Sequence, residues 1–497
     1  MTLASLLFDA PGDPDAVAVT AGAVDRTLGQ LREQAEAIAS ALRAAGVEPG
    51  QVVTVSLPSG PDVVASLFGV WRAGAVYLPL NPRLTEREAQ RVVAAVPPAA
   101  SIVPTVGAED TRGAGVRVEA TDVAPTDQAR FDQDIALIQF TSGTTGAPKP
   151  VLLRHSGVLE LIDGVVGKLR GPARAAASSD VPERAPMPNL VPVSLSLWAG
   201  IYNVLFARRV GASVVILDPF TTSGFAAAVR RFGLRSTVLP PAAMTMLADD
   251  DAIDDLSPLR YVRSITAPLS PLQARRFRDK FGVSVLNGYG QTEIGGEIVG
   301  WNAAESREFG ESKLGSVGRP HAGVTVRAVD AAGDDVPAGQ SGELWVKTPA
   351  MSAGYADGND LGDRLSPDGW FRTGDVGRVD ADGFVWIEGR VSDMINRGGL
   401  KVFPAEVAEV LRLSPDVEDS AVVGVPDDRL GEVPVAFLVL RAGAVLDPVG
   451  LETLCRQHLA PYKVPVRFVT VDALPRNEVG KVLSGQLVAL ATPERTS

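Results

Sequence analysis

The chain has little cysteine, little histidine and no excess of positive charge, and each shortage excludes a class of protein. One cysteine, Cys455, among 497 residues excludes an intramolecular disulfide and fits a reducing compartment. With three scattered histidines and that one cysteine, there is no plausible zinc cluster. The net charge of -12 argues against nucleic acid or an anionic membrane as main partner, because both reward a basic surface.

Long apolar runs are also missing. No uncharged apolar stretch approaches the roughly 20 residues of a membrane span. The start, MTLASLLFDAPGDPD, has neither the basic region nor the long apolar region of a secretory signal, so we expect a cytoplasmic protein. Cys455 falls at helical spacing with Leu451, Leu454 and Leu459, which predicts a buried core thiol rather than a nucleophile.

The length and the pattern predict more than one domain, since 497 residues exceed one hydrophobic core. A helical pattern in PDVVASLFGVWRAG alternates with strand patterns such as GAVYLPL and ASVVILD, which predicts an α/β fold with mostly parallel sheets. From about Val324 the pieces are shorter and β-rich. We expect a large N-terminal domain of stacked sheets at 1–389, with its β-rich subdomain at 324–389, and a small mobile α+β domain at 390–497.

A glycine- and hydroxyl-rich loop lies in QFTSGTTGAPKPVLLRH, residues 139–155. The apolar run before it predicts a buried strand, and apolar residues after it at helical spacing predict a helix with Ser156 as N-cap. A strand, such a turn and a helix together form an anion site. The loop lacks the Walker spacing, in which the lysine follows the second glycine directly. Taken alone, it fits a solvated polar turn about as well as a nucleotide site.

The segment TSGTTGAPK resembles the phosphate loop of adenylate-forming enzymes, which include acyl- and aryl-CoA synthetases, firefly luciferase and the adenylation domains of peptide synthetases. Further family segments follow in the family's order: NGYGQTE (287–293), GSVGRP (315–320), GWFRTGD (369–375), GRVSDMINRGGLKVFPAEV (389–407) and PRNEVGK (475–481). The resemblance covers nearly the whole chain. It implies that ATP activates a carboxylic acid to acyl-AMP with release of pyrophosphate, and that the acyl group then passes to a thiol.

The resemblance also implies a nucleotide site. The residues that would gather the β- and γ-phosphates are Thr141, Ser142, Gly143, Thr144, Thr145, Gly146 and Lys149. The residues that would surround adenine, ribose and the α-phosphate are Thr266, Ala267, Pro268, Asn287, Gly288, Tyr289, Gly290, Gln291, Thr292, Asp375 and Arg390. Within this set Tyr289 would stack on adenine, and Asp375 would accept hydrogen bonds from the ribose hydroxyls. Glu293 would hold Mg²⁺, a hard cation suited to carboxylate and phosphate oxygens.

Three further roles follow from the resemblance. Lys481 would bridge the substrate carboxylate and the α-phosphate, because attack of one anion on another needs a cation between them. The C-terminal domain would swing about a hinge at Ser392, where Asp or Lys is usual in the family. After that rotation the pantetheine arm of coenzyme A would pass along Gly398, Gly399 and Lys401.

Departures from the family pattern bear on the acid. Ser194 stands where amino-acid-activating relatives have Asp, which disfavours an α-amino acid because its buried ammonium would lack a counterion. SITAPLS stands where most relatives have two glycines ahead of APL, so Ile265 and Thr266 add bulk. Together with Trp198 they predict a bounded, largely apolar pocket. The alternative is that shifts of the backbone offset the added side chains.

The sequence thus predicts a stand-alone ligase that uses ATP, Mg²⁺ and coenzyme A, as a monomer or homodimer. No carrier domain follows Lys481, so the acceptor thiol is expected on another molecule, and a free-standing carrier protein is the alternative to coenzyme A. Two other classes stay open. One is an oxygenase of the luciferase kind. The other is a catalytically silent nucleotide-binding relative, against which the retained Lys481, Glu293 and Asp375 argue.

Overall fold

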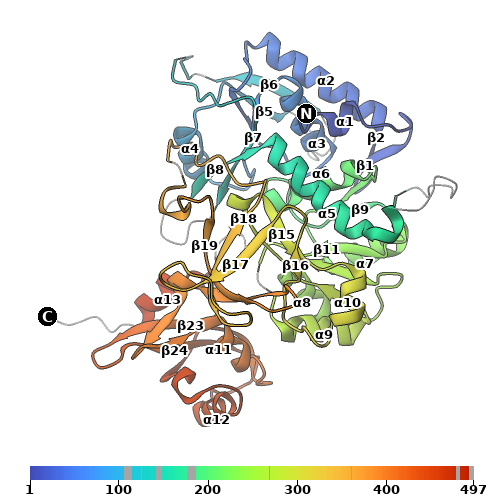
Figure 1. The fold of residues 1–497 in the computed structure, drawn as a ribbon. Coiled ribbons are helices and arrows are strands. Elements are labelled where there is room, and N and C mark those ends of the chain that lie inside the picture. The colour runs from blue at the N-terminus through green and yellow to red at the C-terminus, as the bar shows by residue number, and fades with distance from the viewer. Residues whose placement is uncertain are drawn as a thin grey trace. The chain divides into compact units, whose positions relative to one another are not determined.

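The computed structural model describes residues 1–105, 115–121, 123–124, 126–141, 148–175, 186–267, 269–359, 361–476 and 482–491 (Figure 1). The chain divides into two compact units. Unit 1 comprises Met1–Ile265, Arg275–Thr325 and Lys347–Phe371, and unit 2 comprises Thr266–Ala274, Val326–Val346 and Arg372–Ser497. Most of the predicted β-rich subdomain therefore groups with the C-terminal residues, and the boundary at 389/390 stays a prediction.

Unit 1 contains three sheets in which parallel pairing predominates, as the sequence predicted. In the largest, of order β6-β5-β3-β4-β7-β8, the inner strands run parallel and the outer strands β6 and β8 run antiparallel to their neighbours. The others have the orders β2-β1-β10-β9 and β11-β12-β13. The strands are β1 (Val17–Ala21), β2 (Val24–Thr27), β3 (Val52–Val55), β4 (Val76–Pro79), β5 (Ala100–Pro104), β6 (Val116–Ala120), β7 (Ile135–Thr141), β8 (Lys149–Arg154), β9 (Asn189–Val191), β10 (Val214–Ile216), β11 (Ser236–Leu239), β12 (Tyr261–Ser264) and β13 (Ser284–Leu286).

Helices alternate with these strands and cover the sheets. They are α1 (Ser5–Phe8), α2 (Leu28–Ala44), α3 (Pro61–Arg72), α4 (Glu86–Ala95), α5 (His155–Ala175), α6 (Trp198–Arg209), α7 (Thr222–Phe232), α8 (Pro241–Asp249), α9 (Pro271–Phe281) and α10 (Ala303–Phe309). A small antiparallel sheet, β14 (Gly288–Gln291), β15 (Gly296–Gly300) and β16 (Arg319–Pro320), completes the sheets of unit 1. The 3-10 turns η1 (Thr292–Ile294) and η2 (Gly362–Arg364) belong to the same unit. Among the described residues, no helix is long and apolar enough to cross a membrane.

Helix α3 shows how the sequence encodes these elements. Pro61 occupies the first turn, where its missing N–H costs no hydrogen bond, and every residue from Pro61 to Trp71 is buried. Helix α2 begins with a capping box of Thr27 and Gln30 and packs against α3. At Gly69 a Cβ atom would lie 2.8 Å from the carbonyl oxygen of Ala35, so this glycine permits the close approach of the two helices. The predicted helix is confirmed, and it is buried on all sides rather than along one stripe.

One prediction for the glycine-rich loop was wrong. The loop joins two antiparallel strands, β7 and β8, and helix α5 begins only at His155. Ser156 is therefore inside the helix and not its N-cap. Its amide donates to Asp134 Oδ1 (3.0 Å) and its hydroxyl to Asp134 Oδ2 (2.5 Å), so Asp134 supplies the acceptors for the first turn.

Unit 2 contains a four-stranded sheet and a C-terminal α+β part. The first has the order β17-β18-β19-β20, and the second the order β22-β21-β24-β23 with β25 beside β24. The strands are β17 (Thr325–Val329), β18 (Gly342–Lys347), β19 (Phe371–Val379), β20 (Val385–Arg390), β21 (Ile395–Arg397), β22 (Leu400–Val402), β23 (Val417–Asp427), β24 (Gly431–Leu440) and β25 (Arg467–Thr470). The helices and 3-10 turns are η3 (Val391–Asp393), α11 (Pro404–Leu411), α12 (Pro448–His458), η4 (Pro461–Lys463) and α13 (Ser484–Ala491).

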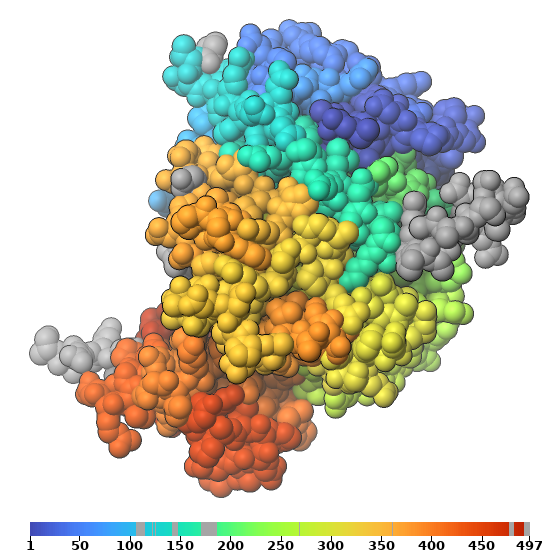
Figure 2. Space-filling view, viewed as in Figure 1, coloured from blue at the N-terminus to red at the C-terminus, as the bar shows by residue number. Residues whose placement is uncertain are grey.

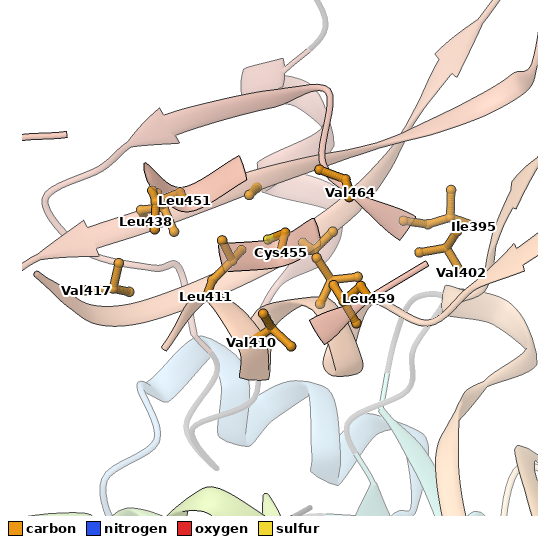
Figure 3. Close-up of a cluster of buried hydrophobic side chains, with 14 residues drawn as sticks. Ile395, Val402, Val410, Leu411, Val417, Leu438, Leu451, Cys455, Leu459 and Val464 are labelled. Atoms are coloured by element: carbon orange, nitrogen blue, oxygen red, sulfur yellow. The ribbon is translucent and has the colours of Figure 1, made fainter. Parts of the chain in front are cut away.

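Cys455 lies in the core of the C-terminal part, as predicted. Its side chain is fully buried among Leu411, Leu438, Leu451 and Leu459 (Figure 3). Burial raises the pKa of the Cys455 thiol to about 11, so the thiol stays protonated at neutral pH. A buried, protonated thiol is a packing group and a poor nucleophile.

The first residues of the chain, dark blue in Figure 2, lie against the teal part of unit 1. His155, the first residue of helix α5, is hydrogen-bonded to Leu3. The backbone amide of Leu3 donates to His155 Nδ1 over 3.1 Å, and the imidazole stacks edge-on against Trp71 with 5.6 Å between ring centres. The histidine is 4% exposed. Burial lowers its pKa from 6.5 to about 4, so the folded chain holds a neutral imidazole that accepts this hydrogen bond.

His155 is therefore expected to make stability depend on pH. Between pH 6.5 and about 4 the unfolded chain binds a proton that the folded chain excludes, so the stabilisation present above pH 6.5 is lost as the pH falls. The loss amounts to on the order of 3 kcal/mol. Urea unfolding at several pH values should show that the free energy of unfolding falls less steeply with decreasing pH in His155→Gln than in the wild type. An equal dependence of the free energy of unfolding on pH in both proteins would contradict this role.

Candidate active site

The described ends of the glycine-rich loop are held together by the β7–β8 hairpin. Thr141 ends β7 opposite Lys149, which begins β8, and the Thr141 hydroxyl donates to the Lys149 carbonyl over 3.4 Å. The Lys149 side chain is exposed, and its Nζ lies 5.2 Å from the centre of the Tyr355 ring. Ser142, Gly143, Thr144, Thr145 and Gly146 lie outside the described residues.

An extended segment at 352–356 ties this hairpin to the GQTE motif. On the hairpin side, the Leu152 amide donates to the Gly354 carbonyl (3.0 Å), and the Ala356 amide donates to the carbonyl of the buried Pro150 (2.8 Å). On the other side, the Ser352 amide donates to the carbonyl of Glu293 over 2.8 Å. The structure therefore places the described ends of the phosphate loop, Thr141 and Lys149, and the GQTE motif on neighbouring elements of unit 1.

The NGYGQTE motif forms strand β14 and the turn η1. Tyr289 lies opposite Val299 of β15, and Gln291 Nε2 donates to its hydroxyl over 3.3 Å. A Cβ atom at Gly290 would lie 1.7 Å from the carbonyl oxygen of Gly296, so only glycine fits there. Asn287 Oδ1 accepts from the amide of Gly288 (3.1 Å). Thr292 and Glu293 follow in η1, with Thr292 half-buried and Glu293 buried.

Glu293 is paired with an arginine that sequence reasoning missed. Arg364 Nη1 donates to Glu293 Oε1 over 2.8 Å, and Nη2 donates to Gln291 Oε1 over 3.0 Å. The guanidinium also lies over the ring of Phe371, 4.4 Å from its centre. Arg364 belongs to η2, 71 residues along the chain from Glu293, and none of the quoted family segments includes it.

The ion pair between Glu293 and Arg364 affects whether Glu293 can bind a metal ion. Mg²⁺ is commonly bound through one or two carboxylates together with substrate phosphates. A buried carboxylate held in place by Arg364 fits such a site, and an arriving phosphate would itself interact favourably with the guanidinium. Glu293 therefore suits the predicted role, with the phosphates of ATP supplying further oxygen ligands.

In unit 2, the structure brings together the two residues predicted to contact ribose. Asp375 on β19 lies opposite Arg390 on β20, and Arg390 Nε lies 3.1 Å from Asp375 Oδ1. The Asp375 carboxylate is buried, and its backbone amide donates to the hydroxyl of Thr373 over 3.0 Å. The arginine thus fixes the carboxylate that would receive the ribose hydroxyls.

Thr266 has a backbone conformation that glycine favours. Its φ is 72°, which makes it the one residue other than glycine with positive φ among the described part of the chain. Ala267 beside it is exposed, and Pro268 lies outside the described residues. The backbone at position 266 therefore has a conformation that glycine adopts freely, and the threonine side chain is accommodated under strain.

Thr266→Gly is expected to stabilise the protein by about 1 kcal/mol. A β-branched residue at positive φ costs about 1–3 kcal/mol, and the greater freedom of glycine in the unfolded chain offsets part of the gain. Urea unfolding measures the change. Thr266→Ala is the control, because alanine keeps a Cβ and should gain much less. A glycine variant no more stable than the wild type would show that position 266 is unstrained.

The residues predicted to line the acid pocket lie in unit 1. Trp198 begins helix α6, its indole N–H donates to the Gly295 carbonyl (3.1 Å), and its ring meets Tyr202 edge-on at 5.8 Å. Ser194 shares a hydrogen bond of 2.9 Å with Ser196, and Ile265 follows β12 half-buried. Trp198 therefore contacts Gly295, which follows the GQTE motif by two residues.

The predicted hinge and coenzyme A path lie in unit 2. Ser392 is exposed in η3 and its hydroxyl donates to Asp393 Oδ1 over 2.9 Å. Gly398 and Gly399, with φ of 60° and 87°, form the two-residue turn of the β21–β22 hairpin. Lys401 is exposed on β22, and Lys481 lies outside the described residues. The positive φ of both turn residues is by itself a structural reason for glycine at these positions, whatever else passes along them.

Comparisons with known proteins show that the sequence and the fold are similar to those of AMP-binding enzymes. The family model of the AMP-binding enzymes matches residues 8–356, and that of the AMP-binding enzyme C-terminal domain matches residues 406–481. A feruloyl-CoA synthase of an Amycolatopsis species is 33% identical over 95% of this chain and 96% of its own. A fatty acid–acyl-carrier-protein ligase of Streptomyces coeruleorubidus is 30% identical over 97% and 94%. The crystal structure of ATP-bound MatB from Rhodopseudomonas palustris superposes with a TM-score of 0.86 at 26% identity, covering 99% of both chains.

Proposed function

The chain belongs to the AMP-binding enzyme family, and we propose that it is an AMP-forming acid–thiol ligase that converts a non-amino carboxylic acid to its coenzyme A thioester. The observation that carries this proposal is the ordered set of motifs across the whole chain, which coincides with the match to both family models. The pairs Glu293–Arg364 and Asp375–Arg390 support it, because each fixes a carboxylate assigned to the nucleotide.

In the first half-reaction a carboxylate oxygen of the acid attacks the α-phosphorus of ATP, and the bond to pyrophosphate breaks. Tyr289 would stack on adenine, Asn287 would meet its amino edge, and Asp375 would accept from the ribose hydroxyls. Lys481 would lie between the two anions, while Thr141 and Lys149 would hold the departing pyrophosphate. Mg²⁺, held by Glu293, would neutralise part of the phosphate charge.

In the second half-reaction the thiol sulfur, deprotonated, attacks the acyl carbon, and the bond to AMP breaks. A rotation about Ser392 would withdraw Lys481 and bring Gly398, Gly399 and Lys401 to the thiol path. The single cysteine, a buried thiol, is compatible with a cytosolic location.

A carrier protein is the specific alternative to coenzyme A as the acceptor of the acyl group. Besides CoA ligases, the relatives include a ligase that acts on an acyl carrier protein, so a free-standing carrier protein is the second candidate acceptor. The slender pantetheine arm and its thiol are common to both acceptors, so the same glycine-lined path would serve either.

The test is to incubate the enzyme with ATP, Mg²⁺, an acid panel and either coenzyme A or a pantetheine-bearing carrier protein. Mass spectrometry should show acyl-CoA and AMP in equal amounts. A thioester formed only on the carrier protein would favour the alternative. Formation of ADP, or AMP release that does not depend on an acid, would contradict an acid–thiol ligase.

A further inference from the structure

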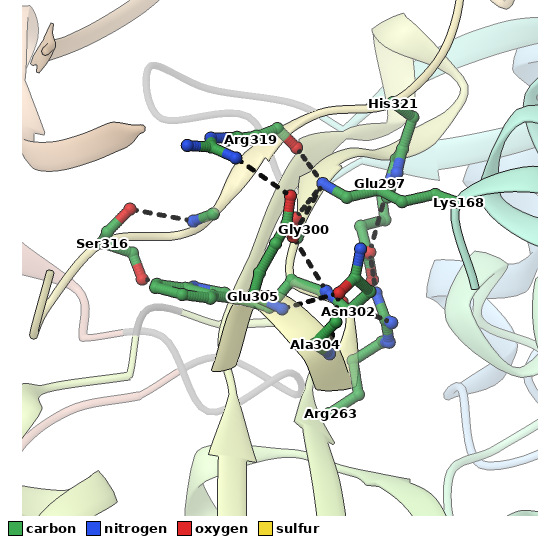
Figure 4. A network of polar contacts seen from close by, with 12 residues as sticks. Lys168, Arg263, Glu297, Gly300, Asn302, Ala304, Glu305, Ser316, Arg319 and His321 are labelled. Atoms are coloured by element: carbon green, nitrogen blue, oxygen red, sulfur yellow. Dashed lines mark hydrogen bonds and ion pairs between the residues drawn. The ribbon is translucent and has the colours of Figure 1, made fainter. Parts of the chain in front are cut away.

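The segment from β14 to β15 carries two carboxylates, and each is paired with an arginine from another part of unit 1. Glu293 lies in the turn η1 and pairs with Arg364. Glu297 lies on β15 and pairs with Arg263 (Figure 4). None of the quoted family segments includes either arginine. The two pairs differ in how firmly the arginine is held.

The pair of Arg263 and Glu297 is a fixed structural contact. Arg263 belongs to β12, which has a parallel neighbour on each side. Its guanidinium donates to the Glu297 carboxylate and, through Nη2, to the Trp301 carbonyl (3.0 Å). His321 Nε2 lies 3.1 Å from Glu297 Oε1 (Figure 4). The side chains of Arg263 and Glu297 are 14% and 15% exposed, so separating them would leave two uncompensated buried charges.

Arg364 is held less firmly than Arg263. It ends the 3-10 turn η2 instead of lying inside a sheet, and its side chain is 31% exposed. An antiparallel bridge between Leu365 and Phe371 brings this turn back, and the guanidinium lies 4.4 Å from the centre of the buried Phe371 ring. The guanidinium therefore rests on an aromatic face with access to solvent, where it can change its hydrogen-bond acceptor.

The pair of Glu293 and Arg364 lies among residues assigned to the phosphates of ATP. Thr292, which belongs to the set assigned to adenine, ribose and the α-phosphate, directly precedes Glu293. The Tyr355 ring lies 5.2 Å from Nζ of Lys149, the described lysine of the phosphate loop. Burial raises the pKa of the Tyr355 hydroxyl, Glu293 raises it further and Arg364 lowers it, so both charges act on this side chain.

The charges of this pair must rearrange when metal and nucleotide bind. Without them, the guanidinium compensates the largely buried carboxylate of Glu293 over 2.8 Å. A metal ion that takes Glu293 as ligand repels the guanidinium, because two cations then compete for one carboxylate. Phosphate oxygens accept well from the planar guanidinium, so exchanging a carboxylate for a phosphate leaves both charged groups compensated.

We propose that Arg364 is a phosphate-binding residue that exchanges its acceptor. It pairs with Glu293 while the nucleotide is absent, and its guanidinium turns to a phosphate of ATP when Glu293 takes the metal ion. This inference rests on the proposed ligase function and adds to it a residue that lies outside the family motifs. It makes the binding of ATP and the binding of the metal depend on each other through one side chain.

The test is calorimetry of ATP binding, with and without Mg²⁺, for the wild type and Arg364→Met. Methionine keeps an apolar stem beside Phe371 and removes the charge. Metal-free ATP should bind about tenfold more weakly to the variant, because its phosphates lose a charge-assisted hydrogen bond and meet an unpaired carboxylate. The affinity for Mg·ATP should change by less than about threefold, because Glu293 no longer has to leave the arginine. Arg364→Lys should restore part of the metal-free affinity, since it keeps the charge without the fork.

The double variant Glu293→Gln/Arg364→Met separates phosphate binding from simple neutralisation of Glu293. It removes both charges, so no unpaired buried carboxylate opposes folding. When compared with Glu293→Gln alone, it should still bind metal-free ATP about tenfold more weakly. If the effect of Arg364→Met disappears in the Glu293→Gln background, the arginine does not bind a phosphate and the inference is wrong.

Arg209→Met is the matched control. Arg209 also donates twice to one carboxylate, that of Asp163 (2.5 and 3.0 Å), at an exposed position. Its loss should leave both ATP affinities unchanged. An Arg364→Met variant that binds metal-free ATP and Mg·ATP with equally reduced affinity would show a merely structural role and overturn the inference. A wild type that binds no ATP in either condition would instead count against the proposed function.

Discussion

Lys481→Ala is expected to abolish acyl-AMP formation while sparing thioester formation from supplied acyl-AMP. The lysine ends the PRNEVGK motif, whose resemblance assigns it to the gap between the acid carboxylate and the α-phosphate. Without it the positive charge between the two anions is lost, and Mg²⁺ alone would have to offset the charge of the pentavalent phosphorus. Loss of one such electrostatic contact costs about 10²–10³-fold in rate. The second half-reaction has no such need, because the domain rotation would already have withdrawn the lysine.

Separate assays of the two half-reactions check this prediction. ATP–pyrophosphate exchange reports the first, and thioester formation from synthetic acyl-AMP and coenzyme A reports the second. Lys401→Ala is the matched variant, because Lys401 is assigned to the thiol path and its loss should produce the opposite pattern. If Lys481→Ala impairs both half-reactions equally, the assigned role is wrong.

The second large effect is expected for Glu293→Gln, with acyl-AMP formation reduced by about a hundredfold. Glutamine keeps the shape of the side chain and can still accept the hydrogen bond from Arg364 at 2.8 Å. It removes the negative charge that makes the carboxylate a ligand for Mg²⁺. The loss should therefore appear as a higher requirement for Mg²⁺ rather than as a loss of folding.

Calorimetry of ATP binding, with and without Mg²⁺, separates these effects without catalysis. Glu293→Gln should weaken binding of Mg·ATP and leave the affinity for metal-free ATP unchanged or higher, because a repulsive carboxylate is gone. Glu308→Gln removes one exposed negative charge outside the site and serves as the control. An unchanged response to Mg²⁺ in the Glu293 variant would remove this residue from the metal site.

The sequence predicted those features that local spacing encodes. Helix α3, strand β7 and the burial of Cys455 follow from apolar periodicity, and the structure confirms each. The ordered motifs named Asp375 and Arg390 separately, and the pairing of β19 with β20 places them opposite each other. The roles of the individual site residues stay predictions.

Features that depend on distant partners were not predictable. The run VLL after Pro150 fits a helix as well as a strand, and it becomes β8 because β7 and residues 352–356 pair with it on both sides. Arg364 meets Glu293 across 71 residues, and no local pattern marks that contact. The contact of Arg263 with Glu297 likewise becomes visible only when strands β12 and β15, from separate parts of the sequence, are assembled.

The central claim, that this chain joins a carboxylic acid to AMP, is tested most directly by ATP–pyrophosphate exchange without coenzyme A. The acid panel should span benzoates, cinnamates, branched or cyclic acids and fatty acids of graded length. Exchange that requires an acid and Mg²⁺, and that is lost in Lys481→Ala, is the predicted result. No exchange with any of these acids, from a folded enzyme that binds ATP, would contradict the claim.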